Sequence, residues 1–303
     1  MQTLYNAIAE FAPGRVLMNE PMCRHTTFRV GGPADVMFFP QSAEELQRAM
    51  ALARAQGAGA LVIGNGSNLV VRDGGVRGLV IVLGEHMARI GVEGACLRAQ
   101  AGAMLARVSA AAQEAGLSGL EFASGIPGTL GGGCAMNAGA YGGQLSDVLS
   151  CATVLLDGEV RTLSRDEMQM SYRSTLPLRA GGIVLAVIAT LACLKTSVGL
   201  ITSCSETFSA IFPKGPAYRV WAVIFSLASF LFANMGLNTI EGCGLKGARV
   251  GGAQVSEKHA GFIVNTGGAT ASDILGLIAL VQRRVLAETG VALETEVRIV
   301  GED

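Results

Sequence analysis

The sequence has almost no net charge, few histidines and no paired cysteine motif. Its 23 Lys and Arg against 24 Asp and Glu give a formal net charge of −1, so no basic surface for nucleic acid is predicted. The three histidines, His25, His86 and His259, lie far apart in the chain. The seven cysteines form no Cys-x-x-Cys pair, which predicts reduced thiols and no metal site.

An export signal and a clear membrane span are also missing. The first ten residues contain neither a basic region nor an apolar one, so we expect a cytoplasmic protein. The strongly apolar run 220–237, which has no charged residue, has about the minimum length of a membrane span. Because Ser226, Ser229 and Asn234 interrupt it, we favour a buried helix and expect no stable membrane insertion.

The hydrophobic patterns predict a mixture of helices and strands. Ser42 followed by Glu45 is typical of a helix start and precedes an amphipathic pattern over 42–56. Similar patterns predict helices over 102–115 and 270–289, the latter capped by Thr270 or Ser272. Short apolar runs predict strands at 60–63, 79–83, 151–156, 183–191 and 296–300. At 303 residues, two or three compact units are expected.

The most informative segment is the glycine-rich run 119–142, whose one charged residue is Glu121. Glycine lets backbone amides approach a ligand closely, so the run predicts contact with a bulky anionic cofactor. A flexible linker is the alternative. We reject it because Ile126, Leu130, Met136 and Tyr141 are side chains of the kind that proteins bury.

A second glycine segment, 64–68, follows a short apolar strand. Its backbone amides, with the polar ends of Ser67 and Asn68, would suit a pyrophosphate. An ordinary turn is an equal alternative, since the spacing of a Rossmann dinucleotide motif is absent. Together, the two glycine segments could hold the two ends of one long cofactor.

Motifs along most of the chain match one family in order. They occur at 25–35, 64–69, 125–132, 136–142, 171–174, 244–247, 252–260, 262–265 and 293–298. On these motifs the chain resembles the UDP-N-acetylenolpyruvoylglucosamine reductases, the MurB flavoenzymes of peptidoglycan precursor synthesis.

The resemblance implies an α+β fold with two domains. A two-part FAD-binding domain of the vanillyl-alcohol-oxidase (PCMH) type would span 1–192, with subdomains of about 15–84 and 85–192. A smaller α+β substrate-binding domain would span 193–303. NADPH would reduce the flavin, which would pass hydride to the enolpyruvyl group of the UDP-sugar and give UDP-N-acetylmuramate. A monomer is expected.

The resemblance also assigns site residues. Arg173 matches the family's active-site arginine, and Glu296 matches its active-site glutamate. Tyr172 and Gln254 are expected to contact substrate, whereas His259 is more typical of a structural histidine. The residues expected at FAD are Gly64, Asn65, Gly66, Ser67, Asn68, Gly125, Ile126, Pro127, Gly128, Thr129, Gly131, Gly132, Asn137, Gly139, Ala140 and Tyr141.

The family pattern breaks between 191 and 240. The family's serine motif, whose second serine donates a proton to the substrate, is absent, and Ser226 stands at that position when counted back from Glu241. Our hypothesis is that the reading frame was lost near residue 192 and regained near 240. Two alternatives to the reductase stay open: an FAD-binding protein of this fold without catalysis, and a different oxidase of the same fold.

Overall fold

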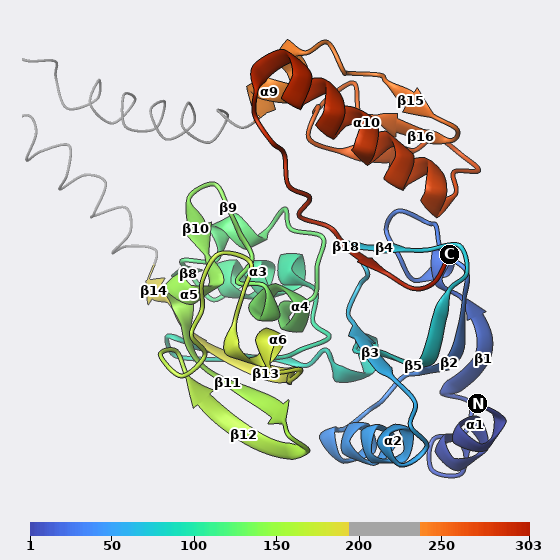
Figure 1. The fold of residues 1–303 in the computed structure, drawn as a ribbon. Helices are drawn as coiled ribbons and strands as arrows, with labels where there is room; N and C mark the ends of the chain where they lie inside the picture. The colour runs from blue at the N-terminus through green and yellow to red at the C-terminus, as the bar shows by residue number, and fades with distance from the viewer. Residues whose placement is uncertain (194–236) are drawn as a thin grey trace, which may run out of the picture. The chain divides into compact units, whose positions relative to one another are not determined.

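The computed structural model describes residues 1–193 and 237–303, which belong to two compact units (Figure 1). The first comprises Met1–Met87 and Gly236–Asp303, and the second comprises Ala88–Met235. The predictions for Ser226, for the uncharged run and for a shifted frame fall on 194–236 and so lie outside the described residues. The expected domain boundary at residue 192 stays a prediction.

The amino-terminal part of the first unit contains a mixed sheet with the strand order β1-β2-β5-β3. β1 and β2 are antiparallel, whereas β5 pairs in parallel with both β2 and β3. Buried side chains such as Met37, Val71 and Val80 form its core. The elements are α1 (Gln2–Ala9), β1 (Val16–Pro21), β2 (Pro33–Phe38), α2 (Ala43–Ala55), β3 (Ala60–Ile63), β4 (Leu69–Val71) and β5 (Val76–Val82), with short 3-10 turns at Met22–Arg24 and Glu85–Met87.

The carboxyl-terminal part of the first unit is built on one long helix, α10 (Ala271–Thr289). Ile274, Leu277 and Val285 are buried from this helix in a core that also includes Val30 and Val70 of the amino-terminal part. The last strand, β18 (Arg298–Val300), pairs in parallel with β4, so the two ends of the chain fold together. The other elements are α9 (Leu237–Gly242) and the antiparallel strands β15 (Arg249–Val250), β16 (Ala253–Val255) and β17 (Ile263–Asn265).

Asp73 caps the start of α10 from a distant part of the sequence. Its carboxylate accepts hydrogen bonds from the Ala271 amide at 2.9 Å, and from the Ser272 amide at 3.1 Å and hydroxyl at 3.0 Å. Desolvation acts to raise the pKa of Asp73, but these hydrogen bonds outweigh it and the pKa lies below its ordinary value. The charged carboxylate therefore stabilises the helix start.

We expect Asp73→Asn to lower the free energy of unfolding by about 1 kcal/mol at neutral pH, a modest amount because Asp73 is solvent-exposed. The pKa of Asp73 is lower in the folded state than in the unfolded state. The stabilisation that the Asp73 carboxylate gives the folded protein is therefore fully present above the ordinary pKa of about 4, and it is lost as the pH falls through the folded pKa. Urea unfolding from pH 7 to pH 3 measures the difference. The exposed Asp157→Asn serves as control, and a difference independent of pH would contradict the prediction.

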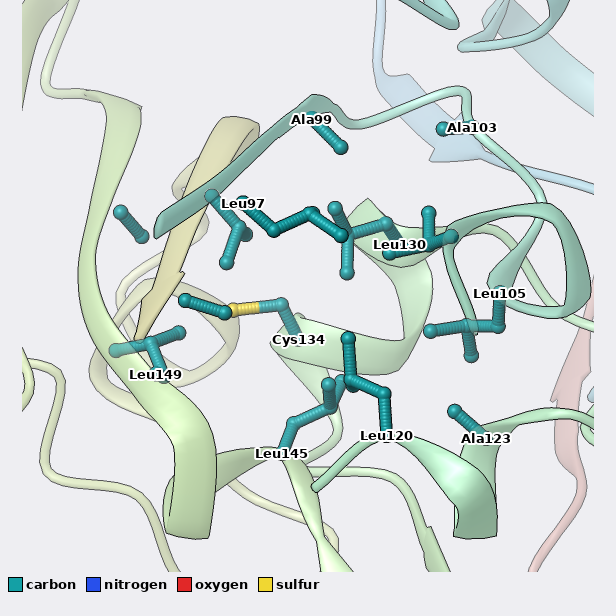
Figure 2. Close-up of a cluster of buried hydrophobic side chains, with 14 of the residues drawn as sticks. Leu97, Ala99, Ala103, Leu105, Leu120, Ala123, Leu130, Cys134, Leu145 and Leu149 are labelled. Carbon is teal, nitrogen blue, oxygen red and sulfur yellow. The ribbon is translucent and has the colours of Figure 1, made fainter. Parts of the chain in front are cut away.

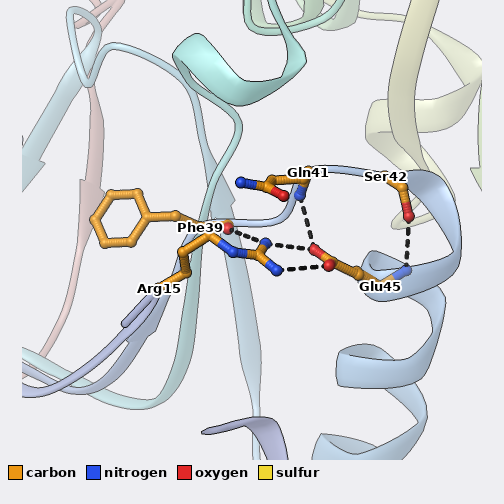
Figure 3. Close-up of polar contacts among 5 residues, drawn as sticks. All are labelled: Arg15, Phe39, Gln41, Ser42 and Glu45. Carbon is orange, nitrogen blue, oxygen red and sulfur yellow. Dashed lines mark hydrogen bonds and ion pairs between the residues drawn. The ribbon is translucent and has the colours of Figure 1, made fainter. Parts of the chain in front are cut away.

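An ion pair connects the start of β1 to α2 (Figure 3). The Arg15 guanidinium donates to both carboxylate oxygens of Glu45, at 2.5 and 2.6 Å, and also to the Phe39 carbonyl. The Gln41 amide donates to the same carboxylate, while the Glu45 amide donates to Ser42 Oγ at 3.2 Å. The predicted Ser42 cap is thereby confirmed, and Glu45 serves two elements at once.

The second unit contains an antiparallel sheet of five strands in the order β12-β11-β13-β7-β6. Its core surrounds α4 (Leu130–Ala135), from which Leu130 and Cys134 point among leucines of the neighbouring elements (Figure 2). Burial raises the pKa of the Cys134 thiol to about 12, so this thiol is a packing group. The other elements are β6 (Ile90–Glu93), β7 (Cys96–Gln100), α3 (Leu105–Glu114), β8 (Leu117–Ser118), a 3-10 turn (Glu121–Ala123), β9 (Gly139–Ala140), β10 (Gly143–Gln144), α5 (Leu145–Val148), β11 (Leu149–Leu156), β12 (Glu159–Ser164), α6 (Leu176–Arg179), β13 (Ile183–Thr190) and β14 (Ala192–Cys193).

The predicted helices and strands are confirmed within a few residues. Thr270 and Asp273 form a capping box at the start of α10, which decides between the two predicted caps. Within the described ranges, no helix has the length and apolar character that a membrane span needs.

Candidate functional site

The loop 64–68 packs closely against the segment before β2. Gly66 is buried with a φ of +61°, and a Cβ on it would lie 2.1 Å from the His25 carbonyl oxygen. The Gly66 carbonyl accepts a hydrogen bond from the Thr27 amide at 3.3 Å. Only glycine fits this position, because both the backbone conformation and the contact exclude a side chain.

The same loop also meets the segment that carries Glu296. The Asn68 side chain donates to the Glu296 carbonyl at 2.9 Å, and the Arg298 amide donates to the Asn68 carbonyl at 3.1 Å. The structure thus brings together an expected FAD residue and the expected active-site glutamate, which are 228 positions apart. Glu296 is exposed and lies two residues before the start of β18.

The glycines at the start of α4 are used largely for packing. The Gly131 amide donates to the Ala101 carbonyl at 2.8 Å, and the Gly132 amide donates to Thr129 Oγ1 at 3.4 Å. A Cβ on Gly131 would lie 2.6 Å from the Ala101 Cβ. Both amides have partners within the protein. Close helix packing explains Gly131, whereas Gly132 is exposed and a Cβ on it would come no nearer than 3.5 Å to Thr129 Oγ1.

The preceding residues of this expected FAD segment are more accessible. Gly125 and Pro127 are exposed, while Ile126 and Gly128 are half-buried. The Gly128 carbonyl accepts from the Leu105 amide at 2.9 Å, which fixes the loop to α3.

One expectation about the hairpin of β9 and β10 was wrong. Tyr141, taken from the sequence as a side chain of buried type, is 85% exposed. It lies between the two strands, where Tyr141 and Gly142 both have positive φ, +52° and +84°. A tight two-residue turn with this geometry turns its side chains outward. Gly139 and Ala140 form the first strand and are half-buried.

Asn137 is buried with all of its side-chain polar atoms engaged. Its Nδ2 donates to Gln144 Oε1 at 3.1 Å and to the Ser171 carbonyl at 3.3 Å, and its Oδ1 accepts from the Ser146 amide at 2.9 Å. The side chain therefore connects the hairpin to the turn at 171–174.

Arg173 lies in that turn. The Ser171 and Ser174 backbones exchange hydrogen bonds of 2.9 and 3.2 Å, and Arg173 has a φ of +52°. Its guanidinium carbon lies 5.6 Å from the ring centre of Tyr172, which is 79% exposed. The turn presents an arginine and an aromatic ring side by side, a pair that suits an anionic organic ligand.

Gln254 lies on β16 and is buried in a polar network. Its Oε1 accepts from Arg249 at 2.8 Å, and its Nε2 donates to Glu257 at 3.2 Å. Sequence reasoning missed Arg249, whose position opposite Gln254 follows only from strand pairing. His259 is exposed beside Phe262, with ring centres 6.2 Å apart. Across residues 1–193 and 237–303, no group of three or more His, Cys, Asp or Glu is arranged to hold a metal ion.

The fold and these two glycine-based segments define a flavoprotein class. A family model described as "FAD binding domain" matches residues 34–164. The structure of alkyldihydroxyacetonephosphate synthase shares the fold at a TM-score of 0.50, with 17% identity over 64% of this chain and 41% of that chain. The chain has the α+β fold of the vanillyl-alcohol-oxidase (PCMH) type.

Closer relatives define the family. A model described as "UDP-N-acetylenolpyruvoylglucosamine reductase, C-terminal domain" matches residues 231–300. The reductase of that name from Alkaliphilus oremlandii is 44% identical over 99% of this chain and 98% of its own length. The crystal structure of the reductase (MurB) from Thermus caldophilus aligns with a TM-score of 0.68 and 31% identity, over 94% of this chain and 97% of that chain. The chain belongs to the UDP-N-acetylenolpyruvoylglucosamine reductase family.

A third model, described as "Branched-chain amino acid transport protein", matches residues 165–244. This range contains the segment where the family pattern breaks, most of which lies outside the described residues. It also includes the turn at 171–174, which carries the reductase motif. The match covers too little of the chain to assign a second family.

Proposed function

We propose that the chain catalyses the NADPH-dependent reduction of the enolpyruvyl group of UDP-N-acetylglucosamine enolpyruvate, which gives UDP-N-acetylmuramate for peptidoglycan synthesis. Family membership carries this function, since the similarity to the Alkaliphilus reductase extends over nearly the whole chain. FAD is the cofactor, and NADPH is the reductant.

FAD, when bound, supplies the hydride. We assign its contacts to the loop 64–68 and to the accessible part of the second glycine segment, Gly125–Gly128. The packing of Gly66 against the His25 carbonyl supports this assignment indirectly, because it holds the backbone of the loop in one conformation in which its amides could meet a pyrophosphate. Tyr141, exposed at its hairpin turn, is proposed to contact the cofactor through its ring.

We assign Arg173 to the substrate carboxylate. A guanidinium stays charged at any physiological pH and can bind a carboxylate through two hydrogen bonds. Hydride addition to the double bond builds negative charge towards that carboxylate, and a fixed cation lowers the free energy of this change. Tyr172, beneath the guanidinium, limits its movement and offers a second contact to substrate.

Glu296 and Gln254 complete the proposed site. Glu296, an exposed carboxyl group whose backbone carbonyl is held by Asn68, is assigned to work with Arg173 on the developing enolate or on proton delivery. Gln254 is assigned to substrate orientation together with Arg249, to which it is hydrogen-bonded. Ser226 is proposed as the proton donor to the substrate carbon, on its sequence position alone.

The remaining expectations are also proposals. We place the FAD-binding domain in residues 1–192 and the substrate-binding domain in 193–303, in line with family matches at 34–164 and 231–300. We propose a monomer in the cytoplasm, where NADPH and UDP-sugars are made.

The function is tested by measuring bound flavin and turnover on the same purified protein. We expect flavin absorbance bands and an NADPH oxidation rate that depends on the enolpyruvyl sugar, with UDP-N-acetylglucosamine as the inactive control. A flavin-containing protein whose NADPH oxidation does not respond to the enolpyruvyl sugar would support the non-catalytic alternative instead.

A further inference from the structure

The turn that carries Arg173 is fixed to the end of α4 at both sides. Before the arginine, the Ser171 carbonyl accepts from Asn137 Nδ2 at 3.3 Å. After it, Thr175 Oγ1 donates to the Ala135 carbonyl at 2.8 Å. Thr175 is completely buried, and its hydroxyl also caps α6 by accepting from the Leu178 amide at 3.4 Å. One hydroxyl thus joins α4, α6 and the turn.

A third connection closes the turn from the solvent side. Arg179, on α6, donates to Ser174 Oγ at 2.9 Å and to Gln169 Oε1 at 2.8 Å. These two partners stand on opposite sides of Arg173 in the sequence. The two guanidinium nitrogens that donate these bonds lie at a fixed separation in one plane. Arg179 therefore sets the distance between Gln169 and Ser174, on the two sides of the turn.

These connections maintain an unfavourable backbone conformation. Arg173 and Gln169 both have positive φ, +52° and +45°, which costs a residue with a side chain about 1 kcal/mol or more. Such residues keep this conformation only where the surrounding contacts enforce it. The contacts made by Thr175, Asn137 and Arg179 are the enforcing ones.

We propose that Thr175 is a positioning residue for Arg173: its buried hydroxyl holds the strained turn so that the guanidinium is already placed for the substrate carboxylate. This inference rests on the proposed function, in which Arg173 meets that carboxylate. Thr175 does not touch substrate, and it acts only through the backbone of the turn. Arg179 supports the same geometry from the exposed side.

The test compares two sugars that differ by the carboxylate-bearing group. Isothermal titration calorimetry on the full, FAD-loaded protein, without NADPH, gives the Kd for UDP-N-acetylglucosamine enolpyruvate and for UDP-N-acetylglucosamine. Thr175→Val keeps the shape but removes the hydroxyl, and Thr175→Ser keeps the hydroxyl. We expect Thr175→Val to raise the Kd of the enolpyruvyl sugar roughly tenfold and to leave the other Kd unchanged. Thr175→Ser restores the wild-type value.

Arg179 offers a second test that does not alter the core, because this residue is exposed whereas Thr175 is buried. Arg179→Met removes the connection between Gln169 and Ser174, and we expect it to change the two Kd values in the same selective way. Arg161→Met is the matched control, since Arg161 is an exposed arginine of the same unit that pairs with Glu159. If Thr175→Val fails to fold, Arg179→Met decides.

The possible results are distinct. Equal weakening of both sugars, or loss of FAD, would show a general structural role and overturn the inference. Unchanged Kd values in both Thr175→Val and Arg179→Met would also overturn it. A wild-type protein that binds the two sugars equally would instead refute carboxylate recognition by Arg173, and with it the proposed function on which the inference rests.

Discussion

Arg173→Met is expected to reduce sugar-dependent NADPH oxidation by roughly a hundred- to a thousandfold, the usual cost of removing one group that stabilises transition-state charge. The methionine retains the bulk and the positive-φ cost of the position but has no charge. FAD binding should persist, because no residue of the loop 64–68 is changed. Initial rates at saturating enolpyruvyl sugar, with flavin absorbance measured on the same samples, provide the comparison.

Two further variants separate charge from geometry. Arg173→Lys keeps the positive charge but loses the two-pronged hydrogen bonding, so its rate should fall between those of the wild type and Arg173→Met. Arg161→Met, an exposed arginine of β12, should match the wild type. If Arg173→Met retains most of the wild-type rate, Arg173 is not the group that meets the developing charge.

The sequence was sufficient for elements whose signals are local. Ser42 and Thr270 each cap a helix through the amide three residues later, and both caps are readable because donor and acceptor lie within one turn. The strands at 60–63 and 183–190 follow from continuous apolar runs. Glycine content identified the segments 64–68 and 119–142, and the family motifs then supplied Arg173 and Glu296.

Contacts between distant residues could not be predicted in this way. Asp73 reads as an ordinary charged residue of a turn, yet it caps a helix 198 positions later. Glycine content alone did not show why each glycine is needed. Gly131 packs against Ala101, whereas Gly66 lies against backbone atoms. Tyr141 is apolar enough for a core, but its place at a tight turn exposes it.

The site itself shows the same division. Motifs identify Arg173, but nothing in the motif shows that Thr175 and Asn137 bind to the end of α4. The expectation of Asn137 at the flavin stays a prediction, and the structure adds that its side chain is hydrogen-bonded within the protein. The sequence thus identifies the proposed catalytic group, and the structure identifies the residues that we propose hold it in place.

Gly66→Ala is expected to abolish FAD binding and to lower the free energy of unfolding by about 3 kcal/mol. The added Cβ would lie 2.1 Å from the His25 carbonyl oxygen, a backbone atom that cannot rotate away. Forcing an atom into a packed site costs about 1 to 3 kcal/mol, and alanine at positive φ costs about 1 kcal/mol more. The displaced loop would no longer hold Asn68 against the Glu296 carbonyl. Flavin absorbance after purification and urea unfolding measure the two effects.

Gly57→Ala separates the collision from the backbone conformation. Gly57 has nearly the same φ, +64° against +61° for Gly66, but nothing lies within 4 Å of a Cβ placed there. Alanine at Gly57 should therefore cost only the conformational part, about 1 kcal/mol, and should leave FAD bound. If both variants lose the same stability and keep FAD, the contact with His25 is soft and the loop 64–68 does not depend on a glycine. If Gly66→Ala alone loses FAD, the close backbone approach at this loop is what the cofactor requires.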